Sequence, residues 1–415
     1  MKFWTITLAF LGSYLLQAQD YTKEKLLQEM LQNNAHLIAE KYSIDVADAE
    51  KKQAGLRQNP TFSIQEVNLW KNGSAEELPH LFGNYGKHQQ VSLELEQVIE
   101  TAAKRKKRVA AKEIEKKIAQ FSYEELLNEL TFSLQEAFVQ LQQLNKKTEI
   151  NQSIIELYQT LAEQYKRQST LRNVSKADYL RIQTALVAYQ QEDIELQQER
   201  TEILGEIRTL TNLPNIELKD LVFEPITFDL TQKISLQILD DIIEKNPTLK
   251  TQSNRIELAK QQISVEKAEA KPDLQFQVSY DRGGSIMRDF VGIGLSFDLP
   301  VFNRNQGQIQ AAHVTMLQEE ANEKSLKNTL INRAKTLMQQ LIMYENLLKE
   351  WQENESDEQT EMIANYRKNL QSKQITLVEF IDFIEAYQDA QMALQDLSLS
   401  YQNTFLQLQY LSKNL

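Results

Sequence analysis

The side chains best placed for chemistry in this sequence are carboxylates, and the strongest pair is Glu379 and Asp382. They lie three residues apart at the start of an apolar-periodic run over 376–412, so a helix there places both on one face. Acids near a helix N-terminus are also favoured by the helix dipole alone. That preference explains Asp178 well and Glu379 in part. The pair is therefore either functional or an ordinary helix-end feature.

Other residues with catalytic or metal-binding chemistry are scattered. The four histidines have no zinc-type spacing and cysteine is absent; the histidines are His36, His80, His88 and His313. Gly292-Ile293-Gly294 lies inside an alternating run and lacks the strand–turn–helix context of a nucleotide loop. We expect no enzymatic activity, no cofactor and no metal site. His80 and His88 fit ordinary exposed histidines better than metal ligands, and a binding role for the loop 70–87 stays open.

Charge and hydropathy exclude two classes of protein. The formal net charge of -12 disfavours a nucleic-acid partner, because phosphate binding needs a basic face. The one basic run, Lys104–Arg108, is either a solvated first helical turn or a contact with lipid head groups. The mean hydropathy of -0.49 is low for a helical membrane protein. Nothing after residue 18 approaches a continuous apolar helical span, so any membrane crossing must use strands.

Residues 1–18 have the pattern of a signal peptide. Lys2 supplies the positive end, residues 3–16 form the apolar core, and Ala18 before Gln19 marks a cleavage site. We therefore expect an exported chain whose mature form starts near Gln19. The absence of cysteine excludes a lipid-modified N-terminal cysteine, so the chain is not expected to be lipidated.

The chain is a single internal duplication. Asn34, Leu37 and Pro60 recur 212 positions later as Asn246, Leu249 and Pro272, and Val174 to Tyr179 recur 201 positions later as Ile375 to Phe380. We assign the first repeat to 19–211, a connector with two prolines to 212–234, and the second repeat to 235–415. The two halves are expected to pack as pseudo-equivalents around an axis.

Each half is predicted to be a long helical hairpin. Apolar residues three or four apart indicate helices over 22–57, 102–167, 175–211, 235–245, 247–270, 308–368 and 376–412. The run over 102–167 contains no Pro or Gly and would reach roughly 100 Å at 1.5 Å per residue. Gln, Glu and Lys fill the other faces, so the simplest interpretation is a coiled-coil spacer.

Four alternating segments between the helices are predicted strands. They cover about 61–69, 88–98, 273–281 and 290–299, and the alternation slips at Glu66-Val67, as it would at a bulge. One interpretation is a small antiparallel sheet with one face on a core. The other is a transmembrane barrel with apolar residues outward. Because the smallest barrels have about eight strands, four cannot close one, whereas three copies would supply twelve.

The segment Gly292–Ile309 resembles the signature of the TolC-like outer-membrane efflux family. That signature is an alternating strand, a Leu-Pro-apolar-Phe corner and an Asn-Arg-X-X-Gly opening into a long helix. Its residues here are Pro300, Phe302, Asn303, Arg304 and Gly307. With the signal peptide, the duplication and the hairpin lengths, the resemblance covers essentially the whole mature chain. The Asn-Arg-Asn-Gln-Gly version resembles the branch that serves heavy-metal cation pumps (cobalt-zinc-cadmium or copper type) of the resistance–nodulation–division class, and Asn59-Pro60 fits that branch.

Two features of this corner have a physical reason. Pro300 cannot donate to a strand ladder, so we expect it to end strand pairing at the periplasmic rim. Gly307 is expected to let the helix and strand backbones come close. The first half has Glu100–Lys104 at the equivalent corner and lacks the proline. The two corners are therefore expected to differ in how sharply they bend.

The resemblance implies a mainly α fold with β structure. Long antiparallel hairpins would form a periplasmic α-barrel, and four strands per chain would join a trimeric 12-stranded transmembrane β-barrel in the bacterial outer membrane. The chain would be a homotrimeric, passive exit duct embedded in outer-membrane lipid. It would work with a periplasmic adaptor (membrane fusion) protein and an inner-membrane resistance–nodulation–division pump. The alternative is a soluble periplasmic coiled-coil scaffold.

The resemblance also assigns roles at the hairpin tips. Glu379 and Asp382 match two acids that narrow the tube entrance in the family, and threefold symmetry would bring them together as a ring that favours cations. The tip residues expected to contact the adaptor are Arg172, Ser175, Asp178, Lys373 and Thr376. Ser175 and Thr376 also fit helix N-caps, each with an acid three residues later. Many family members have a glycine at the turn, which is absent here. The substrate, the adaptor, the pump and the resting state stay open.

Overall fold

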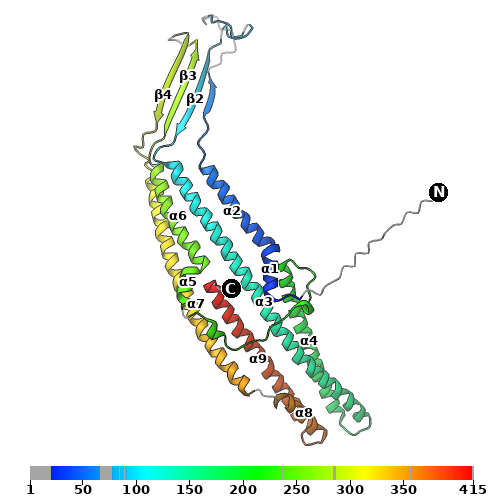
Figure 1. Ribbon diagram of the computed structural model, residues 1–415. Coiled ribbons are helices and arrows are strands. Elements are labelled where there is room, and N and C mark those ends of the chain that lie inside the picture. The colour runs from blue at the N-terminus through cyan, green and yellow to red at the C-terminus, as the bar shows by residue number, and fades with distance from the viewer. Residues whose placement is uncertain are drawn as a thin grey trace, which may run out of the picture. The chain divides into compact units, whose positions relative to one another are not determined.

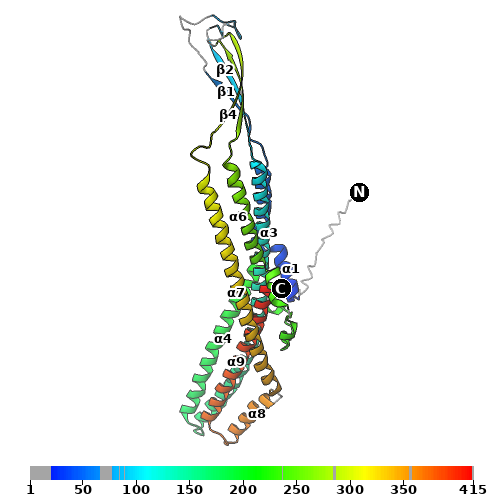
Figure 2. The same cartoon turned by 90° about the vertical axis from the view of Figure 1, so that its left-hand side faces the viewer.

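The structure, a computed structural model, describes residues 20–65, 77–83, 85–87, 89–235, 237–283, 287–354 and 358–413. Long helices and one antiparallel sheet make up this part of the chain (Figures 1 and 2). The predicted signal peptide 1–18, the predicted bulge at Glu66-Val67, His88 and part of the loop 70–87 lie outside the described residues.

The described elements follow the predicted order with shifted ends. They are α1 Lys23–Asn33, α2 Ala35–Ala54, β1 Thr61–Gln65, β2 Val91–Ile99, α3 Lys104–Thr170, α4 Lys176–Thr211, the short 3-10 helices η1 Leu218–Asp220 and η2 Leu230–Lys233, α5 Ile238–Lys245, α6 Pro247–Glu269, β3 Leu274–Arg282, β4 Asp289–Phe297, α7 Gln306–Asn354, α8 Glu358–Gln371 and α9 Leu377–Ser412. No helix in this set is both long enough and apolar enough to cross a membrane.

The single helix predicted over 22–57 is wrong, because Asn34 divides it into α1 and α2. The buried Asn34 side chain accepts a hydrogen bond from the backbone N–H of Leu37 at 2.9 Å and so caps α2. Its amide also donates to the carbonyl of Leu210, at the end of α4, at 2.9 Å. The duplicated Asn246 caps α6 in the same way, through the N–H of Leu249 at 3.1 Å.

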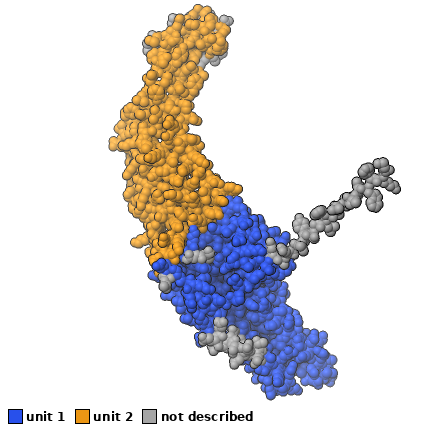
Figure 3. Space-filling model, viewed as in Figure 1, with its two compact units in different colours: residues 1–38, 127–238, 333–415 blue, residues 39–126, 239–332 orange. Residues whose placement is uncertain are grey.

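The chain forms two compact units, and each unit contains segments of both repeats (Figure 3). Unit 1 comprises residues 1–38, 127–238 and 333–415, and unit 2 comprises residues 39–126 and 239–332. The repeats are therefore not separate domains in space. The long helices α3 and α7 each contribute residues to both units.

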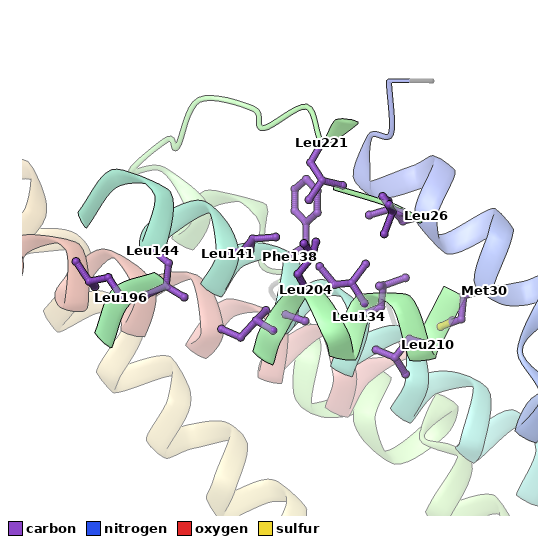
Figure 4. Close-up of a cluster of buried hydrophobic side chains, with 14 residues drawn as sticks. Leu26, Met30, Leu134, Phe138, Leu141, Leu144, Leu196, Leu204, Leu210 and Leu221 are labelled. Atoms are coloured by element: carbon purple, nitrogen blue, oxygen red, sulfur yellow. The ribbon is translucent and has the colours of Figure 1, made fainter. Parts of the chain in front are cut away.

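Unit 1 has a core built from α1, α3, α4 and the connector (Figure 4). Leu26 and Met30 of α1 are fully buried, as is Leu134 of α3. Leu221 of the connector packs in this cluster. On either side of it, the backbones of Asp220 and Val222 form two hydrogen bonds with the backbone of Tyr21. At about 25 cal/mol per Å² of apolar area, burial of such leucines is the main source of stability here.

The far end of the connector is held by a buried carboxylate, Glu345 of α7. Glu345 accepts hydrogen bonds from the N–H and hydroxyl of Thr231, at 2.9 and 2.7 Å, and from the Tyr401 hydroxyl at 2.6 Å. Lys349 donates to it at 2.6 Å, and Tyr401 in turn accepts from the N–H of Leu230 at 2.8 Å. Burial acts to raise the pKa of Glu345, but the hydrogen bonds from Lys349, Tyr401 and Thr231 outweigh it and lower the pKa to about 2.

Replacing Glu345 by Gln should destabilise unit 1 by roughly 2–3 kcal/mol near pH 7, because the charge-assisted hydrogen bonds are lost in a buried position. The folded-state pKa lies below the unfolded value of about 4.3, so this contribution is complete above about pH 5 and is lost as the pH falls toward 2. Thermal unfolding of the purified protein at neutral and acidic pH measures the difference. The exposed Glu199→Gln is the matched control. Equal melting temperatures of the Glu345→Gln variant and wild type at pH 7 would contradict the assignment.

Unit 2 carries the sheet, in which four strands pair antiparallel in the order β1-β2-β3-β4. The register places Phe62, Leu95, Val278 and Ile293 side by side in one row across all four strands. Their exposed fractions are 62%, 47%, 36% and 75%. The described part of the chain therefore leaves this apolar face uncovered, which disfavours a small sheet packed on a core of its own.

The opposite face of the sheet is polar, and two glycines make room for its side chains. A Cβ on Gly292 would lie 2.8 Å from the Ser279 hydroxyl oxygen, and one on Gly294 would lie 3.0 Å from Gln277 Oε1. Both pairs are directly opposite each other in the β3–β4 register. The glycines predicted to lie inside a strand therefore serve close cross-strand packing.

Candidate functional site at the hairpin tips and the strand–helix corners

The first hairpin tip ends α3 with a hydrogen-bonded turn around Arg172. The N–H of Arg172 donates to the carbonyl of Ser169 at 3.0 Å, and the N–H of Asn173 donates to the carbonyl of Gln168 at 2.9 Å. These two bonds define the Schellman motif, which places the residue after the helix in the left-handed region. Arg172 accordingly has a φ of 60°.

The second tip repeats this turn around Lys373. The N–H of Lys373 donates to the carbonyl of Leu370 at 3.1 Å, and the N–H of Gln374 donates to the carbonyl of Asn369 at 2.9 Å. Lys373 also has a φ of 60°. A basic residue in the left-handed conformation therefore makes the turn in each half, and neither tip has a glycine. A left-handed conformation costs a residue with a Cβ about 1 kcal/mol.

Both return helices begin with the predicted N-caps. Ser175 Oγ accepts from the N–H of Asp178 at 3.0 Å at the start of α4. Thr376 Oγ1 accepts from the N–H of Glu379 at 3.3 Å at the start of α9. Only the second is a complete capping box, because the Glu379 carboxylate also accepts from the N–H and hydroxyl of Thr376, at 2.7 and 2.9 Å. These bonds lower the pKa of Glu379, the backbone bond most.

The structure gives the two predicted gate acids different surroundings. Glu379 and Asp382 both lie on the exposed face of α9, while Phe380, Ile381 and Ile384 face the core. The Glu379 carboxylate is held in the cap. The Asp382 carboxylate, in contrast, makes no hydrogen bond or ion pair within the described part of the chain. No group of three or more His, Asp or Glu side chains in that part could hold a metal ion.

The two hairpin ends pack against each other within unit 1. A buried cluster joins α3 and α4 to α8 and α9, and its most buried members are Tyr158, Ile182, Phe380 and Ile384. Around it lies a polar group that the sequence did not indicate. Asn151 donates to the carbonyl of Tyr189 at 3.0 Å, and Gln388 of α9 donates to Glu192 of α4 at 2.5 Å. The first contact joins α3 to α4 within one hairpin, and the second joins the two hairpins to each other.

The second-half corner departs from the prediction at two positions. The last residue pair of the β3–β4 ladder is Leu274 with Phe297, so strand pairing stops three residues before Pro300. Pro300 instead occupies a tight turn in which the N–H of Val301 donates to Leu299 at 2.8 Å. The expectation for Gly307 is wrong, because a Cβ there would meet no described atom within 4 Å. Gly307 lies in the first turn of α7 and does not bring the helix and strand together.

Asn305, which the sequence analysis did not single out, links this corner to α6 by hydrogen bonds. Its side-chain amide donates to the Glu266 carbonyl at 3.0 Å and to the Glu266 carboxylate at 2.7 Å. Its φ is 58°, and Asn is among the residues that tolerate this region. Its N–H donates to Asn303 Oδ1 at 3.0 Å, while Arg304 is exposed and Phe302 is 93% exposed. The sequence signal for this role was an Asn directly before the helix α7, a position that favours helix capping.

The first-half corner is stabilised by an ion-pair cluster. Ala102 and Ala103 have φ values of 49° and 58°, so this corner turns through two consecutive left-handed residues. Lys104 is 4% exposed and donates to Asp273 at 2.8 Å. Arg108 forms ion pairs with Glu100 and Glu269; the latter is 3.3 Å long. For Lys104, which is buried, the interpretation as part of a solvated helical turn is therefore wrong, whereas the Arg108 side chain is partly exposed and ion-paired.

The comparisons with known proteins agree with this architecture. The model of the outer membrane efflux protein family matches residues 26–213 and 238–412. The structure resembles CusC with a TM-score of 0.70 at 14% identity, covering 94% of this chain and 91% of that chain. It resembles the outer membrane channel CmeC of Campylobacter jejuni with a TM-score of 0.73 at 14% identity, covering 94% and 85%. For the outer-membrane channel OprN the TM-score is 0.77 at 12% identity, with coverage of 94% and 89%. No curated protein sequence matches.

The chain therefore belongs to the outer membrane efflux protein family. The family match covers most of both repeats, and the solved channels share the fold of mainly long helices with a small antiparallel sheet.

Replacing Arg172 by Gly should raise the free energy of unfolding by about 0.5–1 kcal/mol, because glycine adopts the left-handed conformation without a Cβ clash. Arg172→Ala removes the same charge but keeps the Cβ, so it should give no gain. Lys373→Gly and Lys373→Ala should behave likewise, since both tips share one turn. Chemical unfolding of the purified protein measures these differences. A gain in the alanine variants equal to that in the glycine variants would show that charge, not backbone strain, is responsible.

Proposed function

We propose that this chain is the outer-membrane channel of a tripartite efflux system and serves as a passive exit duct. Three copies close a 12-stranded transmembrane β-barrel, and their helical hairpins form an α-barrel that extends into the periplasm. The signal peptide predicted over 1–18 and a non-lipidated N-terminus belong to this proposal, as does insertion in the bacterial outer membrane. Energy and most of the selectivity come from an inner-membrane pump.

The observation that carries this proposal is the uncovered apolar face of the sheet. Ile293 is 75% exposed, and Leu295 on the same edge strand is 62% exposed. The strands β2, β3 and β4 have nine residues each, the length of a tilted transmembrane strand. The strands β1 and β4 are the edges of the described sheet and each has one paired side. Unpaired edges and an apolar face are both satisfied when copies join edge to edge within lipid.

The hairpin tips of unit 1 support a docking role. Arg172, Ser175, Asp178, Lys373 and Thr376 lie in or beside the two duplicated turns, and none of the five is buried. We propose that they contact a periplasmic adaptor (membrane fusion) protein, which joins the duct to a resistance–nodulation–division pump. The identical backbone of the two turns would offer the adaptor two similar sites on each chain.

We further propose that Glu379 and Asp382 form the periplasmic gate and that the cargo is cationic, including heavy-metal cations. Both carboxylates lie on the exposed face of α9, and a threefold ring of such groups favours cations. The Asn-Arg-Asn-Gln-Gly corner, which resembles the heavy-metal branch, supports the same cargo. In this chain Asp382 is the better candidate for contact with cargo, because the Glu379 carboxylate is held in the helix cap.

The oligomeric state separates this proposal from the soluble periplasmic scaffold. We expect protein extracted from the membrane fraction to require detergent and to have the mass of three chains by light scattering, after subtraction of the detergent. The physical reason is that the apolar face and the two sheet edges need lipid and neighbouring copies. A monomer or dimer that is soluble without detergent would overturn the duct and favour the scaffold.

Replacing Asp382 by Asn should lower the cation-to-anion permeability ratio roughly twofold or more in planar bilayers, because a fixed charge leaves the entrance. Glu379→Gln should have an additional effect while preserving the cap, since Gln also completes a capping box. Glu156→Gln, on the exposed face of α3, is the matched control. The reversal potential in a gradient of potassium or zinc chloride reports the ratio. An unchanged reversal potential in the double variant would remove both residues from the gate.

A further inference from the structure

The four connections between strands and helices meet at one end of the sheet, here called the corner end. At this end β1 and β3 begin, after α2 and α6, and β2 and β4 end, before α3 and α7. All four connections belong to unit 2. The antiparallel order of the strands therefore places residues from four distant parts of the sequence at the same level of the molecule.

An exposed cation lies in three of these connections, and a fourth lies in the first turn of α3, directly after the connection that follows β2. The four cations are Arg57 before β1, Lys106 after β2, Lys271 before β3 and Arg304 after β4. Within the described residues none of the four has an ion-pair partner. This repetition is unexpected in a chain whose formal net charge is -12.

Three of the carboxylates nearby are neutralised by cations, whereas the Glu266 carboxylate is bound by the neutral amide of Asn305. Asp273 pairs with Lys104 at 2.8 Å, and Glu269 pairs with Lys104 and Arg108 at 3.4 and 3.3 Å. Glu100 also pairs with Arg108. Asp298 is the exposed acid at the corner end for which the described residues show no partner. The surface of the corner end is therefore positive.

The opposite end of the sheet does not share this excess. Among its described residues, acids and bases are equal in number: Glu77, Asp281 and Asp289 against Lys87, Arg282 and Arg288. Lys87 pairs with Glu77 at 3.1 Å, and Arg282 is 5% exposed. Among the residues that the structure describes, the excess of positive charge is thus found at the corner end and not at the opposite end of the sheet.

Exposed apolar side chains lie directly beside these cations. Phe302 is 93% exposed two residues before Arg304, and Leu299 and Val301 are 72% and 56% exposed. An aromatic residue and a cation at the boundary of an apolar strand face are typical of the membrane–water interface, where the ring lies at the level of the head groups.

We propose that Arg57, Lys106, Lys271 and Arg304 bind the phosphate groups of anionic phospholipids in the membrane leaflet at the corner end of the sheet. The inference rests on the proposed function in one respect, which is that the sheet lies in a bilayer. Charge complementarity selects the occupant, because four unpaired cations next to an apolar face match a lipid that has both an anionic head and acyl chains. The bound lipids would set the depth of the sheet in the membrane.

The test is native mass spectrometry of the detergent-purified full chain titrated with phosphatidylglycerol and, separately, with phosphatidylcholine. We expect phosphatidylglycerol to bind preferentially, with a preference that declines at high salt. Each cation replaced by Gln should weaken that binding about fivefold, since one Lys or Arg near an anionic surface contributes about 1 kcal/mol. The variant carries Arg57→Gln, Lys106→Gln, Lys271→Gln and Arg304→Gln together.

A matched control replaces four exposed cations of unit 1, far along the sequence from the sheet connections: Lys166→Gln, Lys176→Gln, Arg181→Gln and Lys335→Gln. The control should keep the lipid preference. Equal binding of the two lipids, or an unchanged preference in the corner-end variant, would overturn the inference even if the protein is a detergent-dependent trimer. A protein that is soluble without detergent would overturn both this inference and the proposed duct.

Discussion

The constraint on which the rest of this structure depends is that the described part of one chain cannot supply partners for the edges and the apolar face of its own sheet. Four strands leave two edges with open hydrogen-bonding groups and an apolar face with nothing against it. In the proposed duct, both needs are met by further copies of the chain and by lipid. The helices, in contrast, build two cores within the chain, one around α1 and one beneath the hairpin tips. Folding of the helical parts and closure of the sheet are therefore separate requirements.

Much of the architecture could be predicted from hydrophobic periodicity, because the helices are long and almost free of Pro and Gly. The strands followed from strict alternation, and the N-caps at Ser175 and Thr376 are confirmed. The division at Asn34 was not foreseen, since an asparagine within an apolar-periodic run gives no local sign that a distant carbonyl will bind it. The ion pair of Lys104 with Asp273 could not be predicted either, because the two residues are far apart in sequence.

The candidate site was less predictable than the fold. Periodicity correctly placed Glu379 and Asp382 on one exposed face, but it could not show that the cap holds one carboxylate and leaves the other unbound. The left-handed turns at Arg172 and Lys373 carry no glycine to mark them. Glu345 did leave a signal, because it occupies an apolar-periodic position between Leu341 and Leu348, both buried. An acid at such a position indicates a buried polar network.

The two attachments of the connector limit how far parts of unit 1 can separate. At its midpoint, Phe223 packs against Phe138 of α3, with tilted rings whose centroids are 5.0 Å apart. Near its end, Leu230 and Thr231 are bound to Tyr401 of α9 and Glu345 of α7. The stretch from Phe223 to Leu230 reaches at most about 25 Å when fully extended. It is thus a tether of fixed maximum length between helices of the two repeats. In the proposed duct, any widening that parts these helices further must first detach one end of the tether.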